Sequence, residues 1–396
     1  MCASFAPHTG SMIITGEHIS SVVRYEENNI DHQHNLNPFF NEIDQYIAGK
    51  KDKLVITHIG DSHIQADFLT HETRQLFQRT FGNGGRGFVF PYRALRTNGP
   101  LNVNLDYGGE WQSCRSAILS NDCNFGICGM TATTFDSSAF LRIDPNSFGE
   151  MNYEFDRLKL FHFQSAHSFD PVFLESDSSL KSCDILPVSS SVSEVYFGEM
   201  QDSLWIAFRN QSPQHYFQLF GMSLENEHRG LVYNAIGQNG AFVNSYLRST
   251  FFGEQLAALN ADLVIVSLGT NDGYKSEGMF CKACFKEKYG ELIKRIETAN
   301  PNAAILLTTP GDFYVRQRYH NKNIEEIRQA ILELAVEHST GVWDFNDVMG
   351  GDHAIKKWRA EGLAQRDLVH YTEKGYTLQG RLLYEAIMQA YESRFD

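Results

Sequence analysis

A serine follows a short apolar run early in the chain, within residues 54–63. An apolar run of this length, closed by the turn Gly60-Asp61-Ser62, predicts a buried strand of a parallel sheet. Open α/β sheets bind their ligands just beyond the carboxyl ends of such strands. An unassisted serine hydroxyl is a weak nucleophile. Ser62 is therefore a candidate nucleophile, provided that the chain also supplies a base, a group that orients the base, and an oxyanion hole.

Three further polar clusters occur where the sequence predicts strand ends or the last loop. They are Gly237 at the end of an apolar run, Gly269-Thr270-Asn271-Asp272 after the next run, and Asp367-Leu368-Val369-His370 near the C-terminus. The first two clusters and Ser62 follow neighbouring strands of the predicted sheet, whose carboxyl ends share one edge. Each cluster alone is common in turns and loops, so the hypothesis depends on all four occurring together.

The elements that must position these residues alternate between strand and helix. We expect strands at 54–60, 231–237, 263–269, 304–309 and 342–345, and helices at 37–48, 70–80, 281–299, 324–338 and 372–393. This alternation predicts an α/β fold with a doubly wound, mostly parallel sheet.

The alternation is interrupted between residues 96 and 229, where helical periodicity fades and short runs with partial alternation take over. Several short strands at this spacing predict a β-sandwich. We therefore expect residues 1–95 to form a lead-in and the first part of the α/β domain, residues 96–229 an inserted β-sandwich, and residues 230–396 the remainder of the α/β domain.

The four clusters, in their order along the chain, resemble those of the SGNH (GDSL-type) hydrolases, which carry an early serine, then glycine, asparagine and a late Asp-x-x-His. The resemblance covers about residues 38–95 and 230–396. It implies a flavodoxin-like α/β fold and a serine esterase that needs neither a metal ion nor a cofactor.

The roles of the residues follow from acyl-transfer chemistry on this resemblance. Ser62 is expected to attack an ester carbonyl, His370 to act as general base and then general acid, and Asp367 to fix the tautomer of the imidazole. The expected oxyanion donors are the Ser62 N–H, the Gly237 N–H and the Asn271 side chain. We expect structural rather than catalytic roles for the neighbouring polar residues, and these are His58, Asp61, His63 and Asp272.

Within this superfamily, Gly60-Asp61-Ser62-His63 and the β-rich segment between the serine and glycine clusters are similar to bacterial peptidoglycan O-acetylesterases. This similarity implies an acetyl ester on the C6 hydroxyl of muramic acid as substrate, a carbohydrate-binding-like inserted domain, and a periplasmic or extracytoplasmic location. Residues 1–23 have no basic start and no apolar core, so no signal peptide is visible. The sequence does not choose between a removed signal and a cytosolic protein.

Composition excludes several other classes of protein. A content of 42% hydrophobic and 13% aromatic residues can bury a large core and argues against disorder. A net charge of -14 repels phosphate backbones, so we expect no nucleic-acid partner. No apolar run approaches the roughly 20 residues of a membrane span.

Seven cysteines leave at least one unpaired within the chain. Cys281 and Cys284 are near enough to meet, but no second C-x-x-C completes a zinc site, and we expect unpaired, incidental thiols throughout. Three alternative functions stay open: an acetylxylan or other polysaccharide esterase, a lipase-like enzyme, and a non-catalytic carbohydrate-binding envelope protein. The complete Ser62, His370 and Asp367 set argues against the last.

Overall fold

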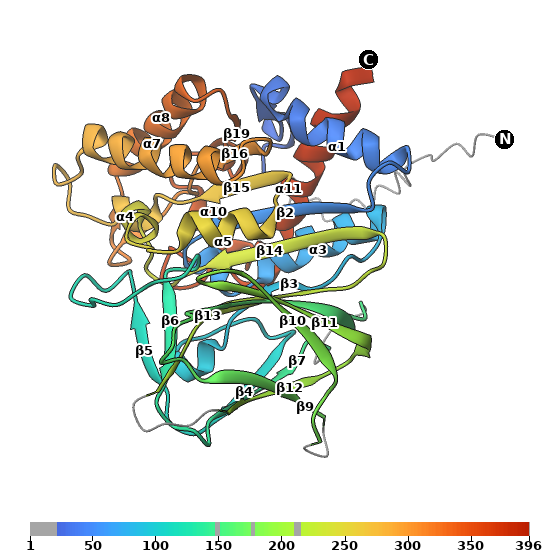
Figure 1. The fold of residues 1–396 in the computed structure, drawn as a ribbon. Helices are drawn as coiled ribbons and strands as arrows, with labels where there is room; N and C mark the ends of the chain where they lie inside the picture. The colour runs from blue at the N-terminus through green and yellow to red at the C-terminus, as the bar shows by residue number, and fades with distance from the viewer. Residues whose placement is uncertain (1–21, 147–150, 176–178, 210–214, 396) are drawn as a thin grey trace.

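A computed structural model of the chain describes residues 22–146, 151–175, 179–209 and 215–395. The expectation about a signal peptide falls almost entirely on residues 1–21 and lies outside the described residues. Figure 1 shows a layered α/β part stacked on two antiparallel sheets. The α/β part is built from the beginning and the end of the chain, and the antiparallel sheets from its middle.

The central sheet has six strands, and the five that carry the core run parallel. In spatial order they are β1 (Ile30–Asp31, antiparallel), β19 (Gly341–Trp343), β16 (Ala304–Thr308), β15 (Leu263–Ser267), β2 (Lys53–Gly60) and β14 (Gly230–Gly237). Gly60 of β2 is in register with Gly237 of β14 and with Ser267 of β15. The carboxyl ends of these three strands therefore coincide at one edge.

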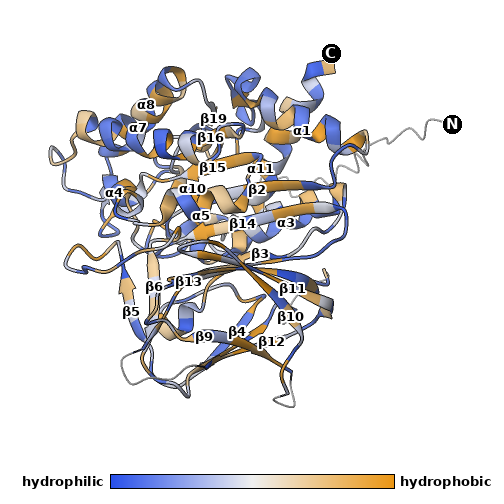
Figure 2. Cartoon of the chain, in the orientation of Figure 1, coloured by the Kyte–Doolittle hydropathy of each residue, from blue (hydrophilic) through white to orange (hydrophobic). Residues whose placement is uncertain are grey.

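Helices cover both faces of the central sheet, as the strand–helix alternation predicts. One face is packed by α1 (Asn37–Ile47), α3 (Phe68–Phe81) and α11 (Glu373–Glu392), and the other by α5 (Phe252–Leu259), α7 (Lys282–Ala299) and α8 (Asn323–Glu337). Successive residues of β15 enter the two cores in turn, and the strands are largely hydrophobic in Figure 2. None of the described helices combines the length and hydropathy that a membrane span requires.

Two antiparallel sheets lie between β2 and β14 in the sequence. The larger has β10 (Cys183–Ser189), β11 (Val192–Gln201), β8 (Phe155–His162), β13 (Phe217–Glu225), β6 (Met130–Thr134) and β5 (Gln112–Arg115), with β3 (Gly87–Val89) also pairing with β13. The smaller has β4 (Asn104–Gly108), β7 (Phe140–Asp144), β12 (Leu204–Arg209) and β9 (Asp170–Leu174). Phe208 of β12 meets Phe217 of β13 with ring centroids 4.6 Å apart, so the two sheets share a core. The domain boundary at residue 96 stays a prediction, and β3 precedes it.

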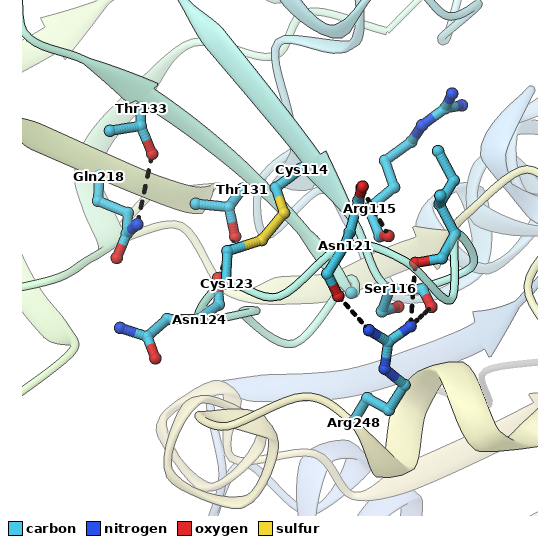
Figure 3. The surroundings of a disulfide bond; sticks show 12 residues. Cys114, Arg115, Ser116, Asn121, Cys123, Asn124, Thr131, Thr133, Gln218 and Arg248 are labelled. Atoms are coloured by element: carbon cyan, nitrogen blue, oxygen red, sulfur yellow. Dashed lines mark hydrogen bonds between the residues drawn. A yellow bond between two sulfur atoms is a disulfide. The ribbon is translucent and has the colours of Figure 1, made fainter.

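Four of the seven cysteines form disulfides, so the expectation of unpaired thiols is wrong for these four. The bonds are Cys114–Cys123 and Cys281–Cys284. Figure 3 shows that the chain between Cys114 and Cys123 turns back over Arg248, whose guanidinium donates hydrogen bonds to the backbone carbonyls of Ser116, Ile118 and Asn121. Because this contact joins residues more than a hundred positions apart, the spacing of the cysteines alone cannot reveal it.

Candidate active site

Ser62 is the first residue of the short helix α2 (Ser62–Gln65), which begins directly after β2. Asp61 caps this helix, and its carboxylate accepts a hydrogen bond of 3.0 Å from the His63 N–H. Two glycines allow α2 to lie close against the sheet. A Cβ on Gly237 would be 2.2 Å from the Gln65 nitrogen, and one on Gly60 would be 2.3 Å from the Ile64 side chain. The glycines at the aligned strand ends thus place the serine at the sheet edge.

The structure brings Ser62, His370 and Asp367 together in one chain of hydrogen bonds. Ser62 Oγ lies 2.9 Å from His370 Nε2, and His370 Nδ1 lies 2.7 Å from Asp367 Oδ2. A carboxylate that accepts from Nδ1 leaves Nε2 free to accept from the serine hydroxyl. Ser62 lies more than three hundred positions before the other two residues in the sequence. The three side chains nevertheless have the geometry of a nucleophile, a base and its orienting acid.

The loop that carries Asp367 and His370 is held by its own backbone. Asp367 Oδ1 accepts from the N–H groups of Val369 and His370, each at 3.0 Å. Between them Leu368 has a φ of 57°, in the left-handed region that branched side chains rarely adopt. The side chains of Asp367 and His370 stay 38% and 35% exposed, so the pair is open to a substrate from solvent.

Electrostatics favour the charged form of the acid and the protonated form of the base. Burial alone would raise the pKa of Asp367, but the hydrogen bonds from His370 and Val369 lower it to about 2. Burial alone would likewise lower the pKa of His370, yet the hydrogen bond and charge of Asp367, with the charge of Asp61, raise it above the ordinary value. This loop would therefore stabilise an imidazolium if His370 accepted a proton.

His63 packs its ring against the candidate base, a contact that the sequence did not predict. The ring centroids of His63 and His370 are 5.2 Å apart with planes tilted by 35°, and Tyr376 Oη lies 2.9 Å from His63 Nδ1. Burial, and then the charge of His370, lower the pKa of His63 to about 3. His63 is therefore neutral at any working pH and does not compete with His370 as a base.

Asn271 lies on α6 (Thr270–Gly273), directly after β15, and contacts the serine turn. Its Nδ2 donates to Ala241 O at 2.8 Å and to Asp61 Oδ2 at 3.3 Å. Burial raises the pKa of Asp61 to about 6, against hydrogen bonds that lower it. The amide of Asn271, which the sequence predicts as an oxyanion donor, thus contacts Asp61, the residue before Ser62. Its bond to Asp61 is the longer of its two hydrogen bonds.

The remaining polar residues singled out in the sequence have structural partners. His58 is fully buried between Tyr233 Oη at 2.8 Å and Ser267 Oγ at 2.6 Å. Asp272 accepts from the Val243 N–H at 3.2 Å, which fixes the start of α4 (Val243–Leu247). Across the described ranges no group of three or more His, Cys, Asp or Glu side chains is arranged to hold a metal ion.

Comparisons with known proteins agree with this fold. A model of the GDSL-like Lipase/Acylhydrolase family matches residues 202–378, a stretch that contains Gly237, Asn271, Asp367 and His370 but not Ser62. A solved structure described as a peptidoglycan O-acetylesterase aligns with 90% of this chain and 96% of its own, with a TM-score of 0.76 and 23% identity. A sequence comparison with curated proteins found no match.

Two further solved structures cover only part of the chain. A lipase/acylhydrolase from Enterococcus faecalis covers 40% of this chain and 77% of its own, at 20% identity and a TM-score of 0.33. An acetylxylan esterase from Geobacillus stearothermophilus covers 40% and 73%, at 19% identity and a TM-score of 0.32. The family match over residues 202–378 and the α/β fold confirm the resemblance to the SGNH (GDSL-type) hydrolases.

Proposed function

We propose that this protein is a serine esterase that removes O-acetyl groups from peptidoglycan, at the C6 hydroxyl of muramic acid. The observation that carries the proposal is the hydrogen-bonded chain from Ser62 Oγ through His370 to Asp367, at 2.9 and 2.7 Å. A carboxylate-oriented imidazole on a serine hydroxyl is the arrangement that activates serine toward acyl groups.

The reaction proceeds in two half-reactions. Ser62 Oγ attacks the acetyl carbonyl carbon while its proton moves to His370 Nε2. The tetrahedral intermediate collapses when His370 returns this proton to the leaving sugar oxygen, which leaves an acetyl group on Ser62. Water then attacks this acetyl group with His370 again as base, releasing acetate and restoring the serine.

Three groups are proposed to stabilise the oxyanion of each tetrahedral intermediate: the N–H groups of Ser62 and Gly237 and the amide of Asn271. Asn271 Nδ2 becomes available by giving up its longer bond, the 3.3 Å contact with Asp61. Gly237 has a second reason to be glycine, since a side chain there would collide with α2. Donors that are fixed in advance in this way typically contribute a factor of about 10²–10³ each.

The substrate and the location are proposed on three supports. The motif Gly60-Asp61-Ser62-His63 is typical of peptidoglycan O-acetylesterases, and the fold is similar over most of the chain to a protein described as one. Two disulfides suit an oxidising extracytoplasmic compartment. We also propose that the two antiparallel sheets form an inserted, carbohydrate-binding-like β-sandwich.

The test is acetate release from purified O-acetylated peptidoglycan, compared with release from acetylated xylan. We expect the wild-type protein to prefer peptidoglycan and the Ser62→Ala variant to release acetate from neither, with an unchanged circular dichroism spectrum. Turnover of p-nitrophenyl acetate by a folded Ser62→Ala protein would refute the esterase mechanism. Equal or faster release from xylan would refute the proposed substrate.

A further inference from the structure

Five exposed cations lie on segments next to the loop that carries Asp367 and His370. The chain carries a net charge of -14. Within the described ranges, however, a set of lysines and arginines near the site has no carboxylate within ion-pair distance. This set, the cationic rim, consists of Lys275, Arg316, Arg318, Lys356 and Arg366, all of which are exposed.

The segments that carry the cationic rim are linked through a single hairpin, β17 (Tyr314–Val315) and β18 (Tyr319–His320). Arg316 and Arg318 lie at the tip of this hairpin. The Arg316 N–H donates to Tyr274 Oη at 3.0 Å, which brings the tip beside Lys275. Lys356 Nζ lies 4.4 Å from the centre of the Tyr314 ring.

The same hairpin is bonded to both loops that carry proposed site residues. The Tyr314 N–H donates to Leu368 O at 2.8 Å, between Asp367 and His370. On its other side, Asn321, which follows β18, donates from Nδ2 to Gly273 O at 2.7 Å, at the end of the helix that carries Asn271. The cationic rim therefore lies next to the segments that carry Asp367, His370 and Asn271.

Several carboxylates lie near the cationic rim. Asp272 interacts by charge with Lys275, although burial raises the pKa of Asp272 to about 7 against this charge and the bond from the Val243 N–H. Asp352 is exposed and lies 3.9 Å from His320, and Glu277 is paired with Lys322 at 3.0 Å. Asp312, on the hairpin side, is buried and bonded to His320 at 2.6 Å. The guanidinium groups of Arg316 and Arg318 are thus exposed to solvent and free of ion pairs in the described structure, so they can bind carboxylates from another molecule.

We propose that the cationic rim binds the carboxylates of an anionic substrate polymer and so guides its acetylated sugar to Ser62. The inference rests on the proposed function and names its substrate class: a glycan strand that bears carboxylate-containing peptides, in contrast to a neutral acetylated polysaccharide. A rim of one charge sign beside a reaction site raises the local concentration of an oppositely charged substrate, and salt weakens the effect.

The experiment compares two pairs of neutralising substitutions. The test variant is R316N/R318Q; Asn is chosen because Arg316 has a φ of 51° and Asn tolerates the left-handed region. The control variant is K288Q/K294Q, which removes two exposed lysines of α7 that have no ion pair in the described structure. The measured quantity is the ratio of kcat/KM on O-acetylated peptidoglycan to kcat/KM on p-nitrophenyl acetate.

At about 20 mM salt, we expect R316N/R318Q to lower this ratio by roughly three- to tenfold and K288Q/K294Q to leave it unchanged. Raising salt to about 200 mM should lower the wild-type ratio and bring the two variants together. Equal losses in both variants, a wild-type ratio that does not respond to salt, or the same loss on acetylated xylan would each overturn the proposal.

A second measurement separates this inference from the proposed function. De-O-acetylated peptidoglycan keeps its carboxylates but offers no ester, so its co-sedimentation with the Ser62→Ala protein reports binding alone. We expect R316N/R318Q in this background to reduce the bound fraction more than K288Q/K294Q does. If the wild-type protein releases no acetate but this difference in binding persists, the proposed reaction is refuted and the binding role of the cationic rim is supported. If the two variants bind equally, the binding role of the cationic rim is refuted.

Discussion

Replacing Asp367 by asparagine tests the part of the site that the structure defines most sharply. Asp367 Oδ2 accepts a hydrogen bond from the Nδ1–H of His370 at 2.7 Å. An asparagine amide turned to keep its contact with the backbone N–H groups presents an NH₂ group to Nδ1, so the imidazole takes the opposite tautomer. His370 Nε2 then carries the proton and cannot accept the one from Ser62, although every atom stays close to its present position.

The size of the effect has two contributions. The pKa of Asp367 is about 2, against 3.8 for the unperturbed group, which corresponds to about 2 kcal/mol at about 1.4 kcal/mol per pKa unit. Because the side chain is 38% exposed and two backbone N–H groups also contribute to this shift, about 1 kcal/mol is left for stabilising the imidazolium. Loss of the correct tautomer adds to this, and together we expect kcat to fall by about 10²–10⁴.

The assay is the pH dependence of kcat and kcat/KM on p-nitrophenyl acetate. In the wild-type protein His370 must be neutral to act as base, so activity is lost as pH falls through its pKa, which the charge of Asp367 holds above 6.5. In Asp367→Asn the residual activity should show this acid limb at lower pH, because the charge that raised the pKa is gone. Asp106→Asn, in an exposed pair with Arg93, is the matched control. A folded Asp367→Asn protein with more than half of wild-type kcat, or an unmoved acid limb, would refute the reasoning.

Three other predictions follow from single contacts. Asn271→Ala should lower kcat on p-nitrophenyl acetate by about 10²–10³ with little change in KM; a change in KM alone would contradict a role at the oxyanion. Gly237→Ala should lower both the melting temperature and kcat, since its Cβ would be 2.2 Å from the Gln65 nitrogen; an unchanged melting temperature and kcat would show that α2 does not need this close approach. His63→Ala should lower kcat by roughly 10-fold or more through misplacement of His370. His63→Phe combined with Tyr376→Phe keeps a ring packed against His370, leaves no buried hydroxyl unpaired, and should stay within about threefold of wild type. Equal kcat values for these two proteins would argue against this ring contact as the positioning contact.

The elements that the sequence predicted well are those that pack against the core along their whole length. The run at 54–60 corresponds to β2 (Lys53–Gly60), and the helix expected at 324–338 is α8 (Asn323–Glu337). A mainly apolar run and a regular apolar face are both buried in the folded state, because helices cover both faces of the central sheet. The order of the four polar clusters was informative for the same reason, since parallel strands bring their ends to one edge.

The features that the sequence did not predict depend on contacts between distant segments. The four-residue helices α2 and α6 are too short to show periodicity, yet they aim Ser62 and Asn271. The Cys114–Cys123 disulfide depends on a loop that Arg248 holds from another part of the chain. Strand β3 is three residues long and is defined by its pairing with β13.

The packing of His63 against His370 contributes to the precision of this site. Asp367 and His370 share one loop, so the bond between them is local and says nothing about where the loop lies relative to the serine. Besides the Ser62–His370 bond and the bond from Tyr314 to the loop, one side chain that contributes to that relation is His63, which is bonded to Tyr376 at 2.9 Å and packs its ring against His370. Tyr376 lies on α11, the helix that follows the catalytic loop, and His63 on α2, the helix that begins with the serine. The contact therefore joins the two halves of the α/β fold at the atoms that react, and catalysis should be more sensitive to it than the stability of the fold.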